Sequence, residues 1–274
     1  MDTKKLCATC KSMKFDEPVN LSFQKKPMWL KKTNYVLDFI HEQREFRIKR
    51  QKKDTMKVSV QLSTENAGLY VLYWAATSND NNLKTREAKA AYDHFQNSGI
   101  SRVNKDGRLD MFIQCPQNYK TVHDNDEYTF YRHVHFVLQK EGMHEWDTSH
   151  ILTFAVTCEI TLGYLKSILR DKTFMIVNAI GSEFDIPDAI HLDTTKSISS
   201  LKRQLVVALQ SYPKIKRAIE TNQIDWYAIP MVVYCKNRMC PMSKQKVLDL
   251  YHKGFVNVSI FPEGFDKMKQ NKLV

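Results

Sequence analysis

Residues 231–243 read MVVYCKNRMCPMS: an apolar run ends at Cys235, a polar loop follows, and a proline precedes the next periodic segment. Pro241 suits the first position of a helix, where its missing N–H leaves no hydrogen bond unmade. The pattern predicts a strand, a loop and a helix, with Cys235 at the end of the strand. Loop amides and the helix dipole favour negative charge at such a place. We therefore expect Cys235 to favour its thiolate, which is the nucleophilic form.

The residues around this loop alternate between strand-like and helix-like patterns. Apolar runs predict strands at 174–179, 230–234 and 256–260, and periodic segments predict helices at 197–209 and 243–253. Gly254 is expected to cap the second helix. Strands separated by helices indicate a parallel sheet, so residues 169–274 are predicted to form an α/β domain.

The order of strand, cysteine loop, helix, glycine and strand resembles a rhodanese domain, in the variant that has a second cysteine in its loop. The resemblance covers about residues 172–270, and the matching positions are Tyr234, Cys235, Asn237, Cys240, Ser243, Leu248, Gly254, Phe255, Asn257, Val258 and Gly264. Residues 182–192, SEFDIPDAIHL, are similar to the family's Glu-Phe…His-Ile-Pro-Gly-Ala segment. The usual Asp-x-Arg of the first strand is Val177-Asn178-Ala179 here, and Asp185 and Asp188 replace a His and a Gly.

This resemblance implies a rhodanese-like sulfurtransferase in which Cys235 accepts a sulfane sulfur and carries it as a persulfide. Lys236, Arg238 and Ser243 are the residues expected to bind the substrate, since positive charge attracts an anionic donor and lowers the pKa of a thiol. Cys240 is the second expected catalytic residue, which either resolves the persulfide or closes a reversible disulfide with Cys235. The expected partners are a small sulfur donor and an acceptor thiol.

The preceding part of the chain, residues 55–168, has the pattern of a β domain. Apolar residues alternate at 58–62, an apolar run at 69–76 predicts a strand, and residues 104–107 predict a tight turn. Residues 133–138 and 151–160 complete the predicted short strands. Residues 84–95 are the expected exception, a short helix. Several short strands at this spacing are typical of a β-sandwich.

Two histidines in this region lie on one face of a predicted strand. His133 and His135 are separated by a single residue, and side chains in a strand repeat on one face every second residue. Two imidazoles at this spacing can share a metal ion. An ordinary strand can also show this alternation by chance, so the pair alone leaves both interpretations open.

A succession of motifs around these histidines resembles the intradiol ring-cleaving dioxygenases. The matching segments are 71–76 with Trp74, 91–95 with Tyr92, 105–108 with an Asp-Gly turn, 115–119 with Tyr119, 133–136 with both histidines, and Leu152-Thr153. Over about residues 57–162, the resemblance implies an immunoglobulin-like β-sandwich that holds a non-haem ferric ion. Its ligands would be Tyr92, Tyr119, His133 and His135, and the charge of Fe(III) would deprotonate the two tyrosines.

The chain also departs from this family. The family's arginine three residues before the first histidine is Phe130 here, while Arg132 stands directly before His133. The interval between Tyr119 and His133 is shorter than usual, which removes sequence that forms the substrate pocket. The helical N-terminal dimerisation region of the enzymes has no clear counterpart, and the oligomeric state is left open.

Composition places few limits on function. The chain has 274 residues, of which 43% are hydrophobic and 26% are charged, as is usual for globular proteins. It contains no apolar run of about 18 residues that would span a membrane, and its N-terminus does not have the pattern of a signal peptide. Six cysteines without such a signal predict free thiols in a reducing, intracellular compartment.

Residues 1–54 are predicted to be a basic, partly helical extension. They hold 14 lysines and arginines against 7 acidic residues, in a chain of net charge +11. The surplus suits an acidic partner or nucleic acid, and the alternative is a solvated arm. Residues 35–53 are the expected helix. Cys7 and Cys10 have the spacing of half a zinc site, but a full site would need distant ligands, so a chance pair of thiols is the simpler interpretation.

Three functions therefore remain open. The first is a sulfurtransferase that carries a persulfide on Cys235, fused to a β-sandwich that binds iron. The second is a non-catalytic component of a larger assembly, such as a virion or nucleoprotein particle. The third is an intradiol-type dioxygenase of a small aromatic compound. A phosphatase of the related cysteine-loop type needs an arginine at the position of Pro241, so phosphatase chemistry is not expected.

Overall fold

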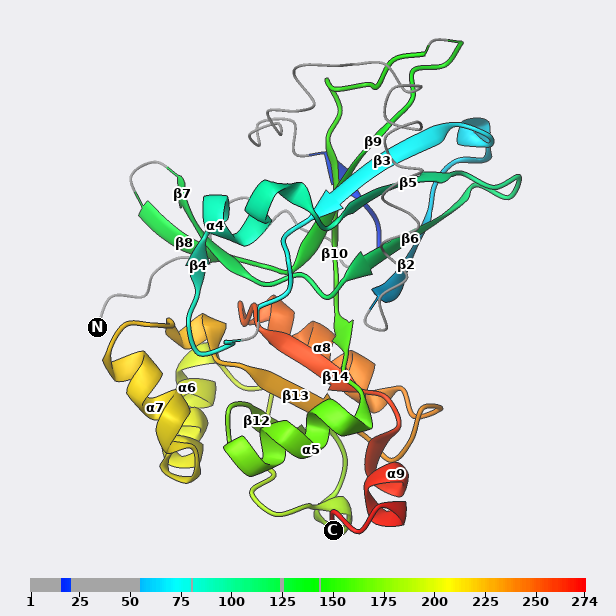
Figure 1. Ribbon diagram of the computed structural model, residues 1–274. Coiled ribbons are helices and arrows are strands. Elements are labelled where there is room, and N and C mark those ends of the chain that lie inside the picture. The colour runs from blue at the N-terminus through cyan, green and yellow to red at the C-terminus, as the bar shows by residue number, and fades with distance from the viewer. Residues whose placement is uncertain (1–15, 21–54, 80, 124–125, 143) are drawn as a thin grey trace. The chain divides into compact units, whose positions relative to one another are not determined.

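The computed structural model describes residues 16–20, 55–79, 81–123, 126–142 and 144–274 (Figure 1). The chain divides into two compact units. Unit 1 ends at Val156 and leaves out Asp80–Arg86, which belong with Thr157–Val274 in unit 2. This division lies before the expected boundary at residue 168. The predicted helix at 35–53 and the pair Cys7 and Cys10 lie outside the described residues.

Unit 1 contains a five-stranded antiparallel sheet with the order β1-β10-β9-β3-β5. Its strands are β1 (Val19–Asn20), β10 (Leu152–Ala155), β9 (His133–Leu138), β3 (Tyr70–Ala75) and β5 (Ser98–Arg102). The central strands β3 and β9 are almost entirely buried, which explains why β3 is a continuous apolar run, whereas β9 also buries His133 and His135. Strand β1 comes from the predicted N-terminal extension and pairs with β10, so part of that extension belongs to the sheet.

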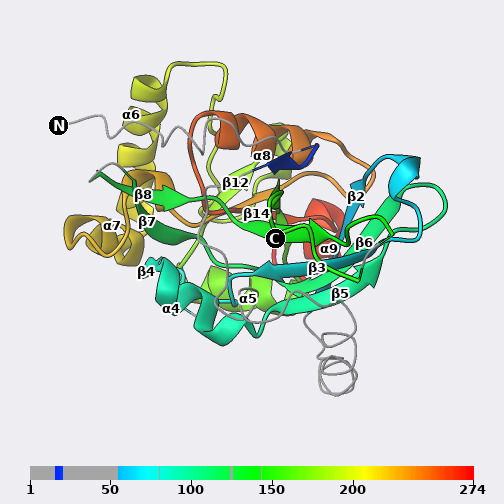
Figure 2. The same ribbon diagram turned by 90° about the horizontal axis from the view of Figure 1, so that it is seen from above.

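A second antiparallel pair joins β2 (Thr55–Gln61) to β6 (Arg108–Gln114), and Figure 2 shows these two strands side by side. Val58 and Val60 of β2 are buried while their neighbours are exposed, as the alternating sequence predicts. The predicted turn before β6 is confirmed. The Asn104 side chain accepts hydrogen bonds from the Asp106 and Arg108 amides, and Gly107 has a φ of +76° that favours glycine.

The remaining part of unit 1 is a hairpin of β7 (Tyr119–His123) and β8 (Asp126–Phe130), together with the short helix α4 (Ala88–Tyr92). The strand β4 (Arg86–Glu87) leads into α4 at the border between the two units. Helix α4 is shorter than the expected 84–95 at both ends: Arg86 and Glu87 form β4 before it, and Asp93, His94 and Phe95 have positive φ angles and end it. Tyr92 is therefore the last residue of the helix.

Unit 2 contains the parallel sheet that the sequence predicts. Four strands run in the order β11-β14-β13-β12: β11 (Cys158–Glu159), β14 (Val258–Phe261), β13 (Met231–Tyr234) and β12 (Met175–Asn178). All neighbouring pairs are parallel. The predicted strand at 151–160 is thus two strands, β10 in unit 1 and β11 in unit 2.

Five α-helices accompany this sheet in the described part of unit 2. Two were predicted, α6 (Ile198–Ala208) and α8 (Met242–His252), and three were not: α5 (Leu162–Asp171), α7 (Pro213–Glu220) and α9 (Gly264–Gln270). Pro241 stands at the N-cap of α8, one residue before the expected first helical position, and Gly254 follows the C-terminus of α8 with a φ of +93°, as expected. No helix among the described residues is long and apolar enough to cross a membrane.

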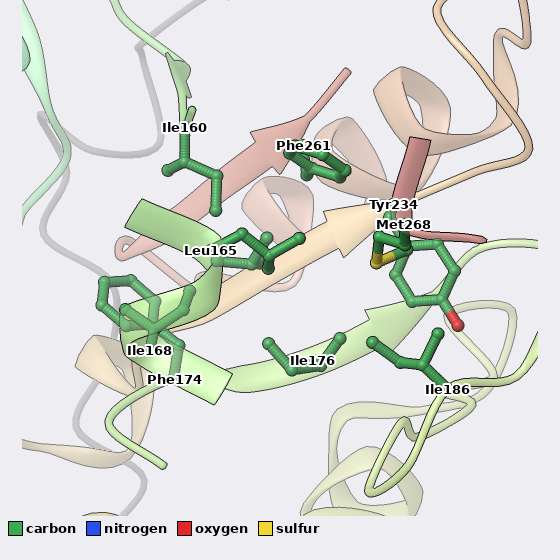
Figure 3. Close-up of a cluster of buried hydrophobic side chains, with 10 residues drawn as sticks. Ile160, Leu165, Ile168, Phe174, Ile176, Ile186, Tyr234, Phe261 and Met268 are labelled. Carbon is green, nitrogen blue, oxygen red and sulfur yellow. The ribbon is translucent and has the colours of Figure 1, made fainter. Parts of the chain in front are cut away.

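One face of the parallel sheet is covered by α5 and α9 (Figure 3). Ile176, Tyr234 and Phe261 come from the strands, and Leu165 and Met268 come from the two helices. Each is buried to 2% exposure or less. Burial of an aliphatic or aromatic side chain of this size stabilises the fold by roughly 1.5–3 kcal/mol, so this cluster is a main source of stability in unit 2.

We expect the substitution Gly264→Ala to destabilise unit 2 by about 2 kcal/mol or more. Gly264 has a φ of +65°, and a Cβ atom there would overlap the carbonyl oxygen of Cys235 and lie 2.6 Å from that of Lys236. Thermal or urea unfolding measures the change. Gly163→Ala is the matched control, because a Cβ at Gly163 meets nothing closer than 4.0 Å. Equal stability of the two variants would contradict the packing described here.

Candidate metal centre and cysteine loop

Four polar side chains converge inside unit 1. Tyr92 ends α4, Tyr119 begins β7, and His133 and His135 lie on one face of β9. The Tyr92 hydroxyl is 3.1 Å from the Tyr119 hydroxyl and 3.2 Å from His133 Nε2. His133 Nε2 is also 3.1 Å from the Tyr119 hydroxyl and 2.9 Å from His135 Nε2. The four residues that the sequence singled out as metal ligands are therefore brought together by three separate elements.

These distances suit a shared metal ion. A protein-bound transition metal has ligand bonds of about 2.0–2.2 Å, so donor atoms at right angles around it are about 3 Å apart. The distances between the donor atoms of the four residues, 2.9–3.2 Å, match this spacing. Two imidazoles and two phenols form a nitrogen and oxygen donor set suited to Fe(III). The residues present therefore fit the ion that the dioxygenase resemblance implies.

The outer nitrogens of both histidines are also bonded. His133 Nδ1 lies 2.6 Å from the Tyr131 carbonyl oxygen, which can only accept, so the Nδ1 atom carries the proton and Nε2 keeps its lone pair. His135 Nδ1 lies 2.7 Å from the Thr153 hydroxyl, which can donate or accept. Partners of this kind fix the orientation and tautomer of metal-bound histidines.

The Thr153 hydroxyl allows His135 to adopt either tautomer. Because His133 Nε2 has no proton to give, the hydrogen bond between the two imidazoles requires a proton on His135 Nε2. His135 Nδ1 then accepts from Thr153. A metal ion would need the Nε2 lone pair, and His135 Nδ1 would then donate to Thr153 instead. Sequence reasoning assigned Thr153 no role, although it stands directly opposite His135 in the pairing of β10 with β9.

The protonation states of this cluster follow from burial. His133 and His135 are 2% and 3% exposed. Burial lowers the pKa of His133 to about 4, although its bond to the Tyr131 carbonyl opposes the shift. Burial and the neighbouring His133 lower the pKa of His135. Burial, followed by the influence of Tyr119, raises the pKa of Tyr92. The imidazoles are therefore neutral, as metal ligands must be, and a bound cation would have to displace phenol protons.

Aromatic rings surround the cluster and limit the access of water. The Trp74 ring lies 5.6 Å from that of His135, and the Phe130 ring meets His133 edge-on at 4.6 Å. An apolar ring, that of Phe130, therefore lies directly beside His133. This environment strengthens electrostatic interactions within the cluster.

The cysteine loop lies in unit 2, directly after β13. Cys235 is 1% exposed and forms a disulfide with Cys240, with a Cα–Cα distance of 6.2 Å. This pairing differs from the free thiols expected from composition. It is the bond of the reversible disulfide that was one of the two expected roles of Cys240, and its reversibility stays a prediction. Cys240 itself is partly exposed.

Hydrogen bonds hold the loop in place at both ends. The Cys235 and Lys236 carbonyls accept from the Phe265 and Asp266 amides at the start of α9, at 2.8 and 2.9 Å. The Asn237 side chain accepts from the Met239 amide and donates to Asp266, and its carbonyl accepts from the Cys240 amide. The amides at the N-terminus of α9 therefore donate hydrogen bonds to the carbonyls that follow β13.

The three predicted substrate-binding residues lie in different surroundings. Lys236 is exposed, with its ammonium 5.8 Å from the centre of the Phe184 ring. Arg238 pairs with two carboxylates, Glu159 at 3.4 Å and Glu263 at 3.1 Å, which offset the charge expected to attract an anionic donor. Ser243 is 3% exposed in the first turn of α8.

The residues that depart from the rhodanese pattern bond to one another. The Asn178 side chain donates to the Gly181 carbonyl and to Asp185, and it accepts from the Ile180 amide. Asp185 also contacts His191 Nε2 at 2.8 Å. Asn178 and Asp185 therefore order the segment after β12. The sequence pattern gave no sign that these two residues contact each other.

No group of three or more His, Cys, Asp or Glu residues in the described ranges could hold a metal ion, so a metal in unit 1 depends on the two phenols. Comparison with known proteins finds no family model that matches the chain and no curated protein that matches it.

We expect the free energy of unfolding of the chain, measured with a chelator present, to fall as the pH is lowered from about 6.5 toward 4. The pKa of His133 is about 4 in the folded chain and about 6.5 when unfolded, so the unfolded chain binds more protons between these values. The contribution of neutral, buried His133 to the free energy of unfolding is fully present above its pKa in the unfolded chain. About 3 kcal/mol of this contribution is lost as the pH falls through its pKa in the folded chain. Urea unfolding at several pH values measures this, and an unchanged pH dependence in His133→Gln would contradict it.

Proposed function

We propose that unit 1 is a non-haem iron centre of the intradiol-dioxygenase type, with Tyr92, Tyr119, His133 and His135 as ligands. The observation that supports it best is the convergence of these four donors at 2.9–3.2 Å, since separate elements must cooperate to produce it. The antiparallel sheets of unit 1 are consistent with the immunoglobulin-like sandwich of that family. The proposed substrate is a small aromatic diol.

A ferric ion held there would supply the Lewis acidity and redox chemistry that cleavage of an aromatic diol requires. The chain's own groups prepare the site for it. Neutral His133 offers its Nε2 lone pair, and neutral His135 offers its own once its Nδ1 atom donates to Thr153; Tyr131 and Thr153 orient the two rings. Tyr92 and Tyr119 would release their phenol protons on binding the ion.

We expect the purified chain, loaded with iron under air, to bind about one ferric ion and to absorb visible light through tyrosinate-to-iron charge transfer. Tyr92→Phe and Tyr119→Phe should each remove roughly half of this absorption, because each phenolate contributes to it. Thr153→Val should weaken iron binding about 10- to 100-fold. Metal analysis and absorption spectra measure these effects, and oxygen uptake with catechol tests ring cleavage.

Tyr73→Phe is the matched control for the tyrosine variants. Tyr73 is also a buried tyrosine of unit 1, at 5% exposure, but its hydroxyl donates to the Phe112 carbonyl, away from the cluster. Iron binding without the visible band would reject tyrosinate ligation. An iron-loaded chain that consumes no oxygen with catechol would reject ring cleavage and keep the metal site.

A second function is proposed for unit 2, a rhodanese-like sulfurtransferase that uses Cys235. Support comes from its place directly after the central strand β13 of a parallel sheet, in a loop whose Cys240 is within bonding reach. In this reaction the reduced Cys235 thiolate attacks the outer sulfur of thiosulfate. The bond between the two donor sulfurs breaks, sulfite leaves, and Cys235 carries the persulfide.

We expect the chain, reduced beforehand, to release sulfite from thiosulfate, and Cys235→Ala to lose this release at least about 100-fold, since the thiolate is the nucleophile. Sulfite is measured because it leaves in the first step, whatever happens to the persulfide. Retained release in Cys235→Ala would reject the assignment. Failure of both this test and the iron test would favour the non-catalytic alternative, a component of a larger assembly whose basic N-terminal residues contact an acidic partner or nucleic acid.

A further inference from the structure

The two cysteines of the loop are placed to react with each other. Their Cα atoms are 6.2 Å apart, within the range in which a disulfide forms, and the structure joins them. The residues between them are held by the Asn237 bonds and by the amides at the start of α9. Reaction between the two sulfurs therefore needs little rearrangement, and held groups of this kind react far faster than free thiols in solution.

The two sulfurs differ in their access to solvent. Cys235 is 1% exposed, whereas Cys240 is partly exposed and lies next to Met239, which is 89% exposed. Met242, on the other side of Cys240, is 47% exposed. An external thiol would therefore reach Cys240 before Cys235, while the nearest thiol to a persulfide on Cys235 is Cys240 itself.

We infer that Cys240 resolves the Cys235 persulfide, so that unit 2 reduces sulfane sulfur to hydrosulfide instead of passing it to an acceptor. This inference rests on the proposed sulfurtransferase function. The Cys240 thiolate attacks the Cys235 Sγ atom and forms the Cys235–Cys240 disulfide. The bond to the outer sulfur breaks, and that sulfur leaves with the electron pair and a proton as hydrosulfide.

A dithiol reductant completes the cycle. One of its thiolates attacks Cys240, the accessible sulfur, which gives a mixed disulfide and frees the Cys235 thiolate. The second thiol of the reductant then attacks its own sulfur in the mixed disulfide and frees Cys240. The reductant leaves oxidised by two electrons, and both cysteines are thiols again. Each turnover consumes one sulfane sulfur and one dithiol and yields one hydrosulfide.

The test uses the full chain, reduced and then freed of small thiols, with thiosulfate as the donor. Wild type is expected to release about one sulfite and one hydrosulfide per chain and to end with the Cys235–Cys240 disulfide. Peptide mapping locates that bond, because the chain has six cysteines. Cys240→Ser should release the same sulfite, keep the mass of one extra sulfur on Cys235, and release hydrosulfide at least about tenfold more slowly.

Cys240→Ala serves as a second variant with the same expectation. Added cyanide should then yield more thiocyanate from either Cys240 variant than from wild type. A persulfide that stays on wild-type Cys235, or hydrosulfide release from Cys240→Ser at the wild-type rate, would overturn the role of Cys240 and leave Cys235 as a sulfurtransferase. The absence of sulfite from every variant would overturn the sulfurtransferase proposal and this inference together.

Discussion

Strand β9 imposes the constraint on which unit 1 depends: it buries two imidazoles on one face at the centre of a sheet. Buried polar groups are costly unless they are hydrogen-bonded. His133 and His135 satisfy this requirement through each other, through Tyr131 and Thr153, and through the phenols of Tyr92 and Tyr119. The ends of α4 and β7 must therefore meet β9 at this point, and the arrangement of the candidate centre follows from hydrogen bonding.

Local sequence patterns predicted the strands, turns and caps whose structure depends on residues close together in the chain. The strands β9, β12 and β13, the turn before β6 and the cap at Gly254 follow from alternation, burial and backbone preference. Pairing between distant strands has no local signal. Strand β1, the position of Thr153 opposite His135, and the split of residues 151–160 between β10 and β11 all depend on such pairing.

The cysteine loop illustrates the same distinction. Its strand, loop and helix were predictable from residues 231–243, because each follows from neighbours in sequence. The partners of the loop come from elsewhere: Asp266 and Phe265 from α9, and Glu159 and Glu263 for Arg238. These contacts change the expected chemistry. The two glutamates offset the positive charge of Arg238, and the α9 amides hold the loop by its carbonyl groups. The closeness of Cys240 to Cys235 therefore matters more for the expected chemistry than activation of the thiol by positive charge.

Both candidate sites bond their reactive groups to one another. In unit 1 the donor atoms share hydrogen bonds, and in unit 2 the two sulfurs share a covalent bond. A metal ion or a reductant must therefore replace an internal partner, so part of its binding or reaction free energy offsets the bonds that it breaks. These internal bonds also ensure that neither site exposes an unpaired imidazole or an isolated buried thiolate. Selectivity follows, because only a ligand able to satisfy all four donors, or an agent able to reach Cys240, gains enough to displace these bonds.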